Sequence, residues 1–370
     1  MLFFTSICAN YLAKAIVLAE SVKQHCENAR FIVCLVEREI PQAARDCTYF
    51  DDIVLSKDIG LENFHGFMFR HTIVEAATAV KPKFFLYLLE QYPETNQFIY
   101  LDPDVLVYGD FFELRSLLQS HSIIVAPHLL RPGNIEMEIS SLVHGAYNLG
   151  FLAISRNPNS MNFLHWWNAR LFSYCYNDKK NGIFTDQKWI DLAPGFFEVH
   201  ILKHHGYDFA TWSLMGSILS KDENQYWVNG DRLRFVHYSG VDSGVIDHAM
   251  EQWLTPENSE IFRELYAHYL ETLNLHGQRQ LATLPWSYRN YESGSPISSK
   301  ARRAYRNPAM WEAIPNPFAS DDRNILKTAR KLSTWKKVIQ TILIKRFRKY
   351  GVLGTLRRAT GKLRKLLDEA

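Results

Sequence analysis

Short apolar runs alternate with amphipathic stretches along the first two thirds of the chain. Residues 2–7 (LFFTSI) are apolar enough to form a buried strand. The stretch after them has apolar side chains at helical spacing, and Asn10 is placed to cap the helix that this spacing predicts. The apolar positions of this helix are Leu12, Ala15, Ile16, Ala19 and Val22.

The same alternation continues downstream. Further buried strands are predicted at residues 31–37 (FIVCLVE), 53–56 (IVLS), 97–109 (QFIYLDPDVLVYG), 122–127 (SIIVAP), 147–157 (YNLGFLAISRN) and 235–240 (FVHYSG). A helix is predicted over 72–92, broken or started at Pro82, and another follows Asn157 as its cap, with Pro158 at its first position. The pattern predicts an α/β fold: a mainly parallel, Rossmann-like sheet flanked by helices, with ligands at the carboxyl ends of strands.

The pattern divides the chain into three regions. Residues 1–245 carry the α/β alternation. Residues 246–322 have a helical and then an irregular pattern, which prolines interrupt. Residues 323–370 form a tail with 15 basic and two acidic residues, a net charge of +13, which leaves −10 on residues 1–322. We therefore expect a folded acidic body with a basic extension.

The basic tail predicts a polyanionic partner. Its apolar residues share one arc at helical spacing, as in helices that lie in a membrane interface; they are Trp335, Val338, Ile339, Ile342, Leu343, Phe347 and Tyr350. Anionic lipid is therefore the expected partner, and the alternative is a helix packed on the body. The acidic body would repel phosphates, so a nucleic-acid partner is not expected.

Composition excludes several classes of protein. The chain has 370 residues with 47% hydrophobic and 22% charged, which is typical of globular proteins. No apolar run approaches the roughly 20 residues that span a bilayer, and the first residues lack the features of a secretory signal. With the basic tail, this predicts a cytoplasmic protein that is peripheral on the inner face of the cell membrane.

The strongest chemical signal is Asp102-Pro103-Asp104, directly after the apolar run FIYL. Two carboxylates at the end of a buried strand can hold a metal ion and orient a ligand, although a solvated turn would have the same sequence. The motif also resembles the nucleophile motif of haloacid-dehalogenase-type phosphatases. In those proteins it usually lies near the start, whereas about 100 residues precede it here.

Four segments in this order, FIYLDPDVLVYGDF, YNLGFLAISR, FTDQKWID and RFVHYSG, carry a resemblance that covers about residues 1–240. The chain resembles the GT-A fold nucleotide-sugar glycosyltransferases of family 8, the glycogenin and lipopolysaccharide galactosyltransferase type. The resemblance implies that residues 1–245 form a GT-A catalytic domain. It also implies transfer of a hexose from a UDP-sugar to a glycan or lipid-linked acceptor, with retention of configuration, in surface polysaccharide synthesis.

The resemblance implies a metal site made by Asp102, Asp104 and His237. Oxygen ligands with one imidazole suit Mn²⁺ or Mg²⁺. A divalent cation that bridges the diphosphate would stabilise the charge on the leaving group. After Gly240 the chain departs from the family pattern, because Val-Asp stands where Lys-Pro-Trp is usual.

The same resemblance places Asp186 and Gln187 at the donor sugar, with Asp186 as the nucleophile or the group that stabilises an oxocarbenium-like state. A helix-capping role is the alternative for Asp186. Asn148 and Gly150 begin a strand that faces the sugars, where Asn can donate and accept hydrogen bonds and Gly allows close approach. A plain turn before the strand would explain both equally well.

Three residues are candidates for nucleotide binding. Tyr11 could stack on uracil, Glu37 could hold the base or ribose, and Lys81 could lie near the diphosphate. Tyr11 could equally be a core aromatic and Lys81 a solvated charge.

Two further groups are less specific. Trp166 and Trp167 lie on the helix after Pro158, where core packing is favoured over an acceptor platform. The cluster HHGYD, with His204, His205 and Asp208, has spacing that suits a metal site poorly, so an acceptor-site loop is favoured.

Overall fold

The computed structural model describes residues 1–223 and 225–334. The described residues form two compact units, residues 1–289 and a second unit that begins at residue 290. The amphipathic arc predicted from Trp335 to Tyr350 lies outside the described residues. Within the described residues, no helix combines the length and the apolar character needed to span a bilayer.

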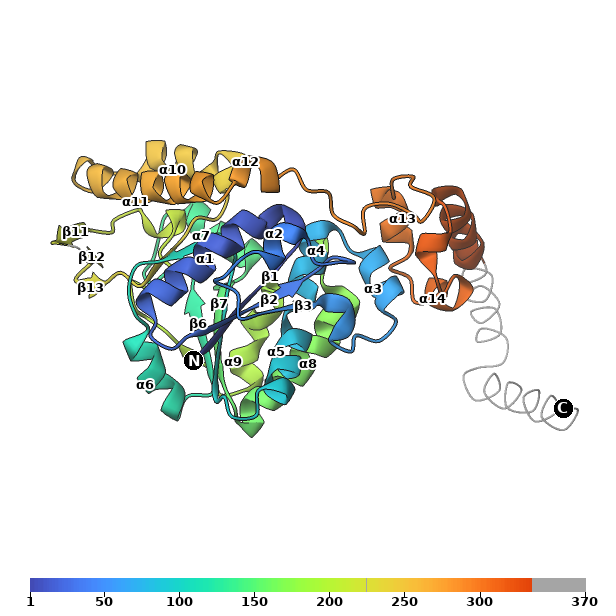
Figure 1. The fold of residues 1–370 in the computed structure, drawn as a ribbon, viewed down its shortest axis with the longest axis horizontal. Coiled ribbons are helices and arrows are strands. Elements are labelled where there is room, and N and C mark those ends of the chain that lie inside the picture. The colour runs from blue at the N-terminus through green and yellow to red at the C-terminus, as the bar shows by residue number, and fades with distance from the viewer. Residues whose placement is uncertain (224, 335–370) are drawn as a thin grey trace, which may run out of the picture. The chain divides into compact units, whose positions relative to one another are not determined.

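The first unit is built on a seven-stranded, mostly parallel sheet, as predicted (Figure 1). In spatial order its strands are β10 (His200–Ile201), β6 (Ile123–Pro127), β7 (Tyr147–Ser155), β4 (Gln97–Leu101), β1 (Leu2–Ile7), β2 (Arg30–Leu35) and β3 (Asp52–Leu55). Only β7 runs antiparallel to its neighbours β4 and β6 in this sheet. The remaining pairs are parallel.

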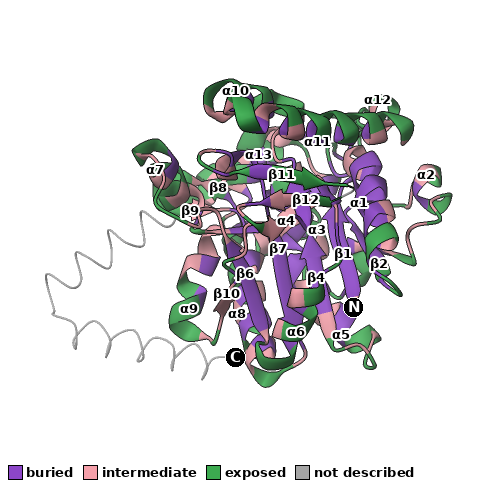
Figure 2. Cartoon of the chain, turned by 90° about the vertical axis from the view of Figure 1, so that its left-hand side faces the viewer, coloured by how far each residue is buried: buried purple, intermediate pink, exposed green. Residues whose placement is uncertain are grey.

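Helices cover both faces of the sheet, so the central strands are apolar throughout. All six residues of β1 are buried, as Figure 2 shows for the interior strands. Phe3 belongs to the core cluster shared with α1 (Leu12–His25) and α6 (Phe112–Ser120). Phe4 points to the opposite face, where its ring packs edge-on against Phe85 of α5 (Lys81–Gln91), with centroids 4.5 Å apart.

The other helices of the first unit are α2 (Gln42–Arg45), α3 (Phe64–Arg70), α4 (Ile73–Ala79), α7 (Ile135–His144), α8 (Pro158–Tyr174), α9 (Ala193–Phe196), α10 (Val245–Trp253), α11 (Pro256–Leu275) and α12 (Gln278–Leu281). The helix predicted over 72–92 is divided into α4 and α5, with Pro82 in the first turn of α5. Asn157 caps α8 as predicted, through a hydrogen bond from the backbone N–H of Asn159.

The predicted cap at Asn10 is wrong. Residues Ala9–Tyr11 form a 3₁₀ turn that leads directly into α1, so Asn10 lies too early to reach the first amides of the helix. Its side-chain oxygen is buried, without a hydrogen-bond partner among the described residues.

The single strand predicted over 97–109 is also corrected, because it is two strands separated by a turn at residues 102–104. The second, β5 (Val105–Val107), leaves the main sheet and pairs antiparallel with β14 (Phe235–His237). The sequence did not predict the short strands β8 (Asn177–Asp178), β9 (Ile183–Phe184), β10 (His200–Ile201), β11 (Leu219–Asp222), β12 (Gln225–Val228) and β13 (Asp231–Arg232).

Helices α10 and α11 share a core cluster with β14. Tyr238, which follows β14, stacks on Tyr269 of α11 with ring centroids 4.0 Å apart. Its hydroxyl donates to the carbonyl of Leu265, at 2.9 Å. Helix α11 therefore supports the strand that carries His237.

The described part of the second unit contains α13 (Ser299–Ala304) and α14 (Ala309–Ala313). Within this unit the hydroxyl of Tyr291 donates to Asp322 at 2.7 Å. Ile325 is fully buried.

Candidate active site

Asp102 and Asp104 lie on the turn between β4 and β5. The N–H of Asp102 donates to the carbonyl of Gly150 in β7, at 2.8 Å. The N–H of Val105 donates to the carbonyl of Asp102, at 3.2 Å, and closes the turn. The turn therefore begins at the carboxyl end of a central parallel strand, where ligands bind in such sheets.

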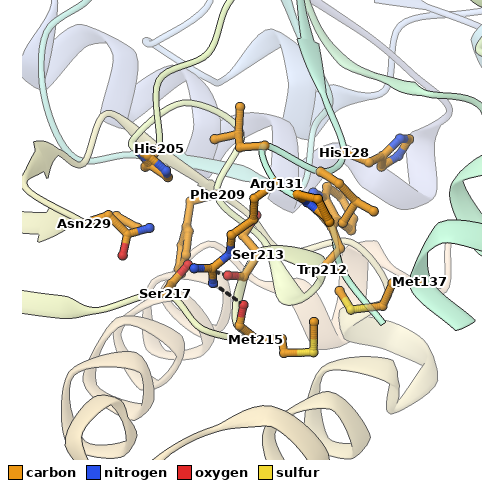
Figure 3. Close-up of a pocket in the computed structure, with 15 residues that line it drawn as sticks. His128, Arg131, Met137, His205, Phe209, Trp212, Ser213, Met215, Ser217 and Asn229 are labelled. Carbon is orange, nitrogen blue, oxygen red and sulfur yellow. Dashed lines mark hydrogen bonds between the residues drawn. The ribbon is translucent and has the colours of Figure 1, made fainter. Parts of the chain in front are cut away.

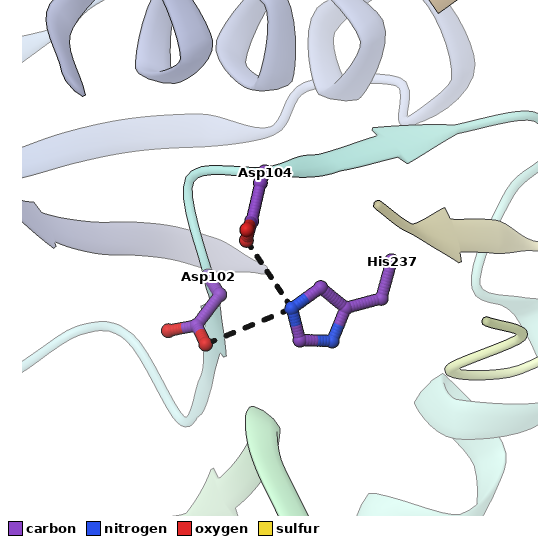
Figure 4. Close-up of side chains that lie close together, drawn as sticks. All are labelled: Asp102, Asp104 and His237. Atoms are coloured by element: carbon purple, nitrogen blue, oxygen red, sulfur yellow. Dashed lines mark ion pairs between the residues drawn. The ribbon is translucent and has the colours of Figure 1, made fainter. Parts of the chain in front are cut away.

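His237 reaches this turn through the pairing of β14 with β5. His237 lies opposite Val105 in the register, and the N–H of Tyr238 donates to the carbonyl of Asp104, at 2.8 Å. The Nε2 atom of His237 is 3.2 Å from Oδ1 of Asp104 and 3.8 Å from Oδ2 of Asp102 (Figure 4). Strand pairing thus joins residues that are 133 positions apart in the sequence.

These three side chains fit a divalent cation. Each offers one ligand atom, and the three atoms lie within 4.8 Å of one another. Two carboxylate oxygens and one imidazole nitrogen form a donor set suited to Mn²⁺ or Mg²⁺. Burial alone would lower the pKa of His237, but the charges of Asp104 and Asp208 raise it well above its usual value. The site therefore favours a positive charge at Nε2.

Gly150 makes room for the imidazole of His237. A Cβ atom at this position would lie 2.4 Å from Cε1 and 2.7 Å from Nδ1 of His237, closer than side-chain carbons approach other atoms. A residue with any side chain would displace the ring. The sequence predicted that Gly150 allows a close approach of the backbone, and in the structure the group that lies close to it is the ring of His237.

The side chain of Asn148 makes hydrogen bonds to two neighbouring residues. Its Oδ1 accepts from the N–H of Gly150 at 2.7 Å, and its Nδ2 donates to Nε2 of His128 at 3.1 Å. Burial lowers the pKa of His128 to about 4, so this imidazole is neutral and can accept at Nε2.

Lys81 is buried and surrounded by three oxygens. Its Nζ lies 2.9 Å from Oδ2 of Asp186, 3.0 Å from the carbonyl of Leu149 and 3.2 Å from Oδ1 of Asp102. Two of the three N–H donors of the ammonium group are used in hydrogen bonds, to Asp102 and to the carbonyl of Leu149, and Asp186 pairs with it by charge. Lys81 therefore supplies a positive charge between the two carboxylates.

Asp186 is almost fully buried, at 3% exposed. Burial raises its pKa, while the nearby Lys81 opposes that shift. Thr185 before it has a positive φ of 43°, and the carbonyl of Asp186 accepts from Nε1 of Trp167 at 3.2 Å. Trp167 is fully buried, so the prediction that it packs in the core is confirmed.

Gln187 bridges two elements. Its Oε1 accepts from the N–H of Leu149 at 3.0 Å, and its Nε2 donates to the carbonyl of His144 at 3.1 Å. It thereby ties the end of α7 to β7.

Two cavities meet at the Asp102 turn. The larger, of about 710 Å³, is lined by the side chains of Lys81, Asp102, Asn148, Asp186, Gln187 and His237, among others. The smaller, of about 320 Å³, is lined by Tyr11, Asp102 and Asp104, and it shares Val74 and Thr78 with the larger one.

A third cavity, of about 40 Å³, lies beyond His128 and Trp212 (Figure 3). Arg131 donates to the carbonyl of Met215 beside it. It offers much less room than either of the other two cavities.

The structure does not bring Glu37 to either cavity. Its carboxylate accepts from the N–H of Ala9 at 2.9 Å and from the N–H of Ser287 at 2.7 Å. Burial raises the pKa of Glu37. In this structure Glu37 joins the loop before α1 to the segment after α12.

The HHGYD cluster does not converge on one point. His205 pairs with Asp231, with Nδ1 2.8 Å from the carboxylate, and His204 lies 4.0 Å from Glu113. Asp208 instead lies 3.2 Å from Nδ1 of His237. This contact was not predicted, because nothing in the spacing of the sequence links two residues that are 29 positions apart.

Comparison with known proteins defines the class of this chain. The profile of glycosyl transferase family 8 matches residues 3–242. The chain therefore belongs to glycosyl transferase family 8, and it is a glycosyltransferase of the GT-A type rather than a phosphatase. Members of this family generally depend on a divalent metal.

Two relatives come from Bacillus subtilis (strain 168). The uncharacterized protein YfnF is 27% identical over 210 residues, which is 53% of this chain and 68% of YfnF. The uncharacterized protein YfnD is 18% identical over 251 residues, which is 64% of this chain and 77% of YfnD.

Solved structures of glycosyltransferases are also similar. The galactosyltransferase LgtC, in complex with donor and acceptor sugar analogs, is 19% identical; the match covers 78% of this chain and 99% of LgtC, with a TM-score of 0.44. The glycosyltransferase GlyE of Streptococcus pneumoniae TIGR4 is 14% identical; the match covers 79% of this chain and 66% of GlyE, with a TM-score of 0.42.

Proposed function

We propose that this glycosyltransferase moves a hexose from a UDP-sugar to a glycan or lipid-linked acceptor, in a reaction that depends on Mn²⁺ or Mg²⁺ and serves surface polysaccharide synthesis. One observation carries the proposal: two of the three possible metal ligands, Asp102 and His237, line the same large cavity as the Lys81–Asp186 pair, and the third, Asp104, lines the smaller cavity that also contains Asp102.

In this proposal Asp102, Asp104 and His237 hold the cation, which when bound offsets the negative charge that develops on the diphosphate. Asp102 faces both cavities, so a diphosphate beside it would join a nucleoside on one side to a hexose on the other. Tyr11 lines the smaller cavity, where its ring would stack on the uracil.

The hexose would then lie in the larger cavity, beside Asp186. The bond between the anomeric carbon and the diphosphate oxygen breaks, with its electron pair left on the departing diphosphate. The acceptor hydroxyl oxygen bonds to that carbon on the same face and its proton passes to the diphosphate oxygen, so the configuration is retained. Lys81 opposes the rise that burial causes in the pKa of Asp186, and the carboxylate beside it would stabilise positive charge on the sugar ring or act as nucleophile. Gln187 and Asn148 would shape the wall around the hexose.

We also propose that the enzyme is cytoplasmic and binds the inner face of the cell membrane through residues 323–370. The support is the net charge of +13 on this segment. Each basic residue near an anionic leaflet contributes about 1 kcal/mol. Such a location would place the active site near a lipid-linked acceptor.

The test of the proposed function is UDP release from a panel of UDP-hexoses, with Mn²⁺ or with excess chelator. We expect release from at least one donor with the metal only, and an α-linked product from an α-linked donor by proton NMR. Equal release in chelator would contradict the metal dependence, and a β-linked product would contradict retention. Release of phosphate from phosphomonoesters, without transfer, would contradict the proposal as a whole.

A further inference from the structure

The two ring nitrogens of His237 face carboxylates on opposite sides. On one side Nε2 points toward Asp104 and Asp102. On the other side Nδ1 lies 3.2 Å from Oδ1 of Asp208. At 3.2 Å this contact is direct, and it is buried, because the side chains of His237 and Asp208 are 4% and 1% exposed.

The backbone places Asp208 firmly behind the ring. The carbonyl of Gly206 accepts from the N–H groups of Arg234 and Phe235, and the carbonyl of Phe209 accepts from the N–H of His237 at 2.8 Å. A Cβ atom at Gly206 would lie 2.0 Å from the carbonyl oxygen of Arg232. Only glycine therefore lets this segment run so close to β13 and β14.

Asp208 is held at some cost in stability. Its φ is +53°, in the left-handed region that residues with a side chain adopt rarely. Its Oδ2 is buried without a hydrogen-bond partner among residues 1–223 and 225–334. A buried carboxylate with one protein partner is unfavourable, so the contact with His237 is the feature that explains it.

We propose that Asp208 is a positioning residue for the metal site. Its carboxylate accepts the Nδ1–H of His237, which leaves the lone pair of Nε2 directed at the cation between Asp102 and Asp104. Metal-binding histidines commonly donate their other ring N–H to a carboxylate, and loss of that partner typically weakens metal affinity 10- to 100-fold. The inference rests on the proposed function, because it requires that the site bind a divalent cation.

The experiment measures Mn²⁺ binding to the full chain without substrate, from the electron paramagnetic resonance signal of free Mn²⁺. We expect Asp208→Ala to raise the Kd about 10- to 100-fold. Asp208→Asn should raise it less, because the amide oxygen still accepts from Nδ1–H. Thermal unfolding in chelator confirms that each variant is folded.

Asp231→Asn is the matched control. Asp231 accepts from a ring nitrogen of His205 in a similar aspartate–histidine pair, and it is not among the possible metal ligands. We expect its Kd for Mn²⁺ to stay within about twofold of wild type, a change far below the effect of losing a carboxylate behind a ligand histidine.

The outcomes separate the two proposals. If the wild type does not bind Mn²⁺, the proposed metal site is wrong and this inference falls with it. If the wild type binds but folded Asp208→Ala binds equally well, only the role of Asp208 is overturned. The wild type also gives a test that needs no variant: with Mg²⁺, nitrogen NMR of labelled histidine should show His237 protonated at Nδ1, and protonation at Nε2 instead would overturn the inference.

Discussion

The ammonium of Lys81 lies 2.9 Å from the carboxylate of Asp186, with both side chains less than 5% exposed. Asp102 is the second carboxylate beside the same ammonium, at 3.2 Å. Loss of Lys81 would therefore leave negative charge in a buried region without compensation.

We predict that Lys81→Met lowers the free energy of unfolding by about 3 kcal/mol or more, as for other buried pairs that lose one partner. Denaturant unfolding measures the change. The double variant with Asp186→Asn should recover part of the loss, because one of the two uncompensated charges is then removed.

Lys23→Met is the matched control for Lys81→Met. Lys23 pairs with Asp51 at the surface, where the two side chains are 28% and 41% exposed, so its loss should cost less than about 1 kcal/mol. If both variants lose the same free energy of unfolding, the ion pair of Lys81 contributes no more to stability than a surface ion pair, which would contradict the prediction.

We predict that Gly150→Ala impairs the metal site. The added methyl group would meet the ring of His237 at 2.4 Å, so the ring must move away from Asp102 and Asp104. Overpacking of this kind typically costs about 1–3 kcal/mol, and Mn²⁺ affinity should fall with it. Gly195→Ala is the control, because its added Cβ would meet no atom within 4 Å among the described residues, apart from its chain neighbours and its own helix backbone. Unchanged Mn²⁺ affinity in Gly150→Ala would show that the site can absorb the methyl group.

His128 should make stability depend on pH. Burial lowers its pKa to about 4 in the folded protein, against about 6.5 when unfolded. Between about pH 4 and pH 6.5 the unfolded chain therefore binds a proton at His128 more tightly than the folded chain does. The contribution of neutral His128 to the free energy of unfolding is complete above about pH 6.5, and it is lost as the pH falls toward about 4.

The comparison is between wild type and His128→Gln, unfolded in chelator at pH 7 and pH 4.5. We expect wild type to lose about 2–3 kcal/mol more than the variant between these pH values. Parallel losses would show that His128 is not held neutral by burial.

Removal of residues 335–370 should release the protein from anionic vesicles. This segment has 11 basic and two acidic residues. The cut is placed after Thr334 because Ile325 is buried, and a cut before it would disturb the second unit. We expect full-length chain to sediment with anionic vesicles at low salt, and less so at high salt, where charges are screened. Equal sedimentation of both chains would contradict the proposed membrane role of these residues.

Much of the fold could be predicted because buried parallel strands leave a strong local signal. The apolar runs at β1, β2, β4 and β7 are each bounded by polar or turn residues, and the cap at Asn157 is followed by Pro158. The short strands β8 to β13 were missed, because two to four residues give no measurable periodicity. The cap at Asn10 was predicted wrongly, because the same types of residue can begin a 3₁₀ turn or an α-helix.

The site was predictable where its residues belong to a motif, and much less so where it depends on contacts between distant segments. Asp102 and Asp104 follow an apolar strand, which is visible in the sequence. The contact between Asp208 and His237 depends on how segment 206–209 runs beside β14, which no local pattern encodes. Similarly, the three oxygens around Lys81 come from three separate segments.

The most direct test of the account is Mn²⁺-dependent UDP release by wild type, Asp104→Ala and His237→Ala, with the best donor from the panel. The account predicts that release by wild type needs the metal and that each variant loses at least about 100-fold in kcat/KM, while thermal unfolding in chelator shows that each variant is still folded. Full activity in Asp104→Ala, or wild-type activity that excess chelator does not reduce, would contradict the central claim that Asp102, Asp104 and His237 form the metal site of this enzyme.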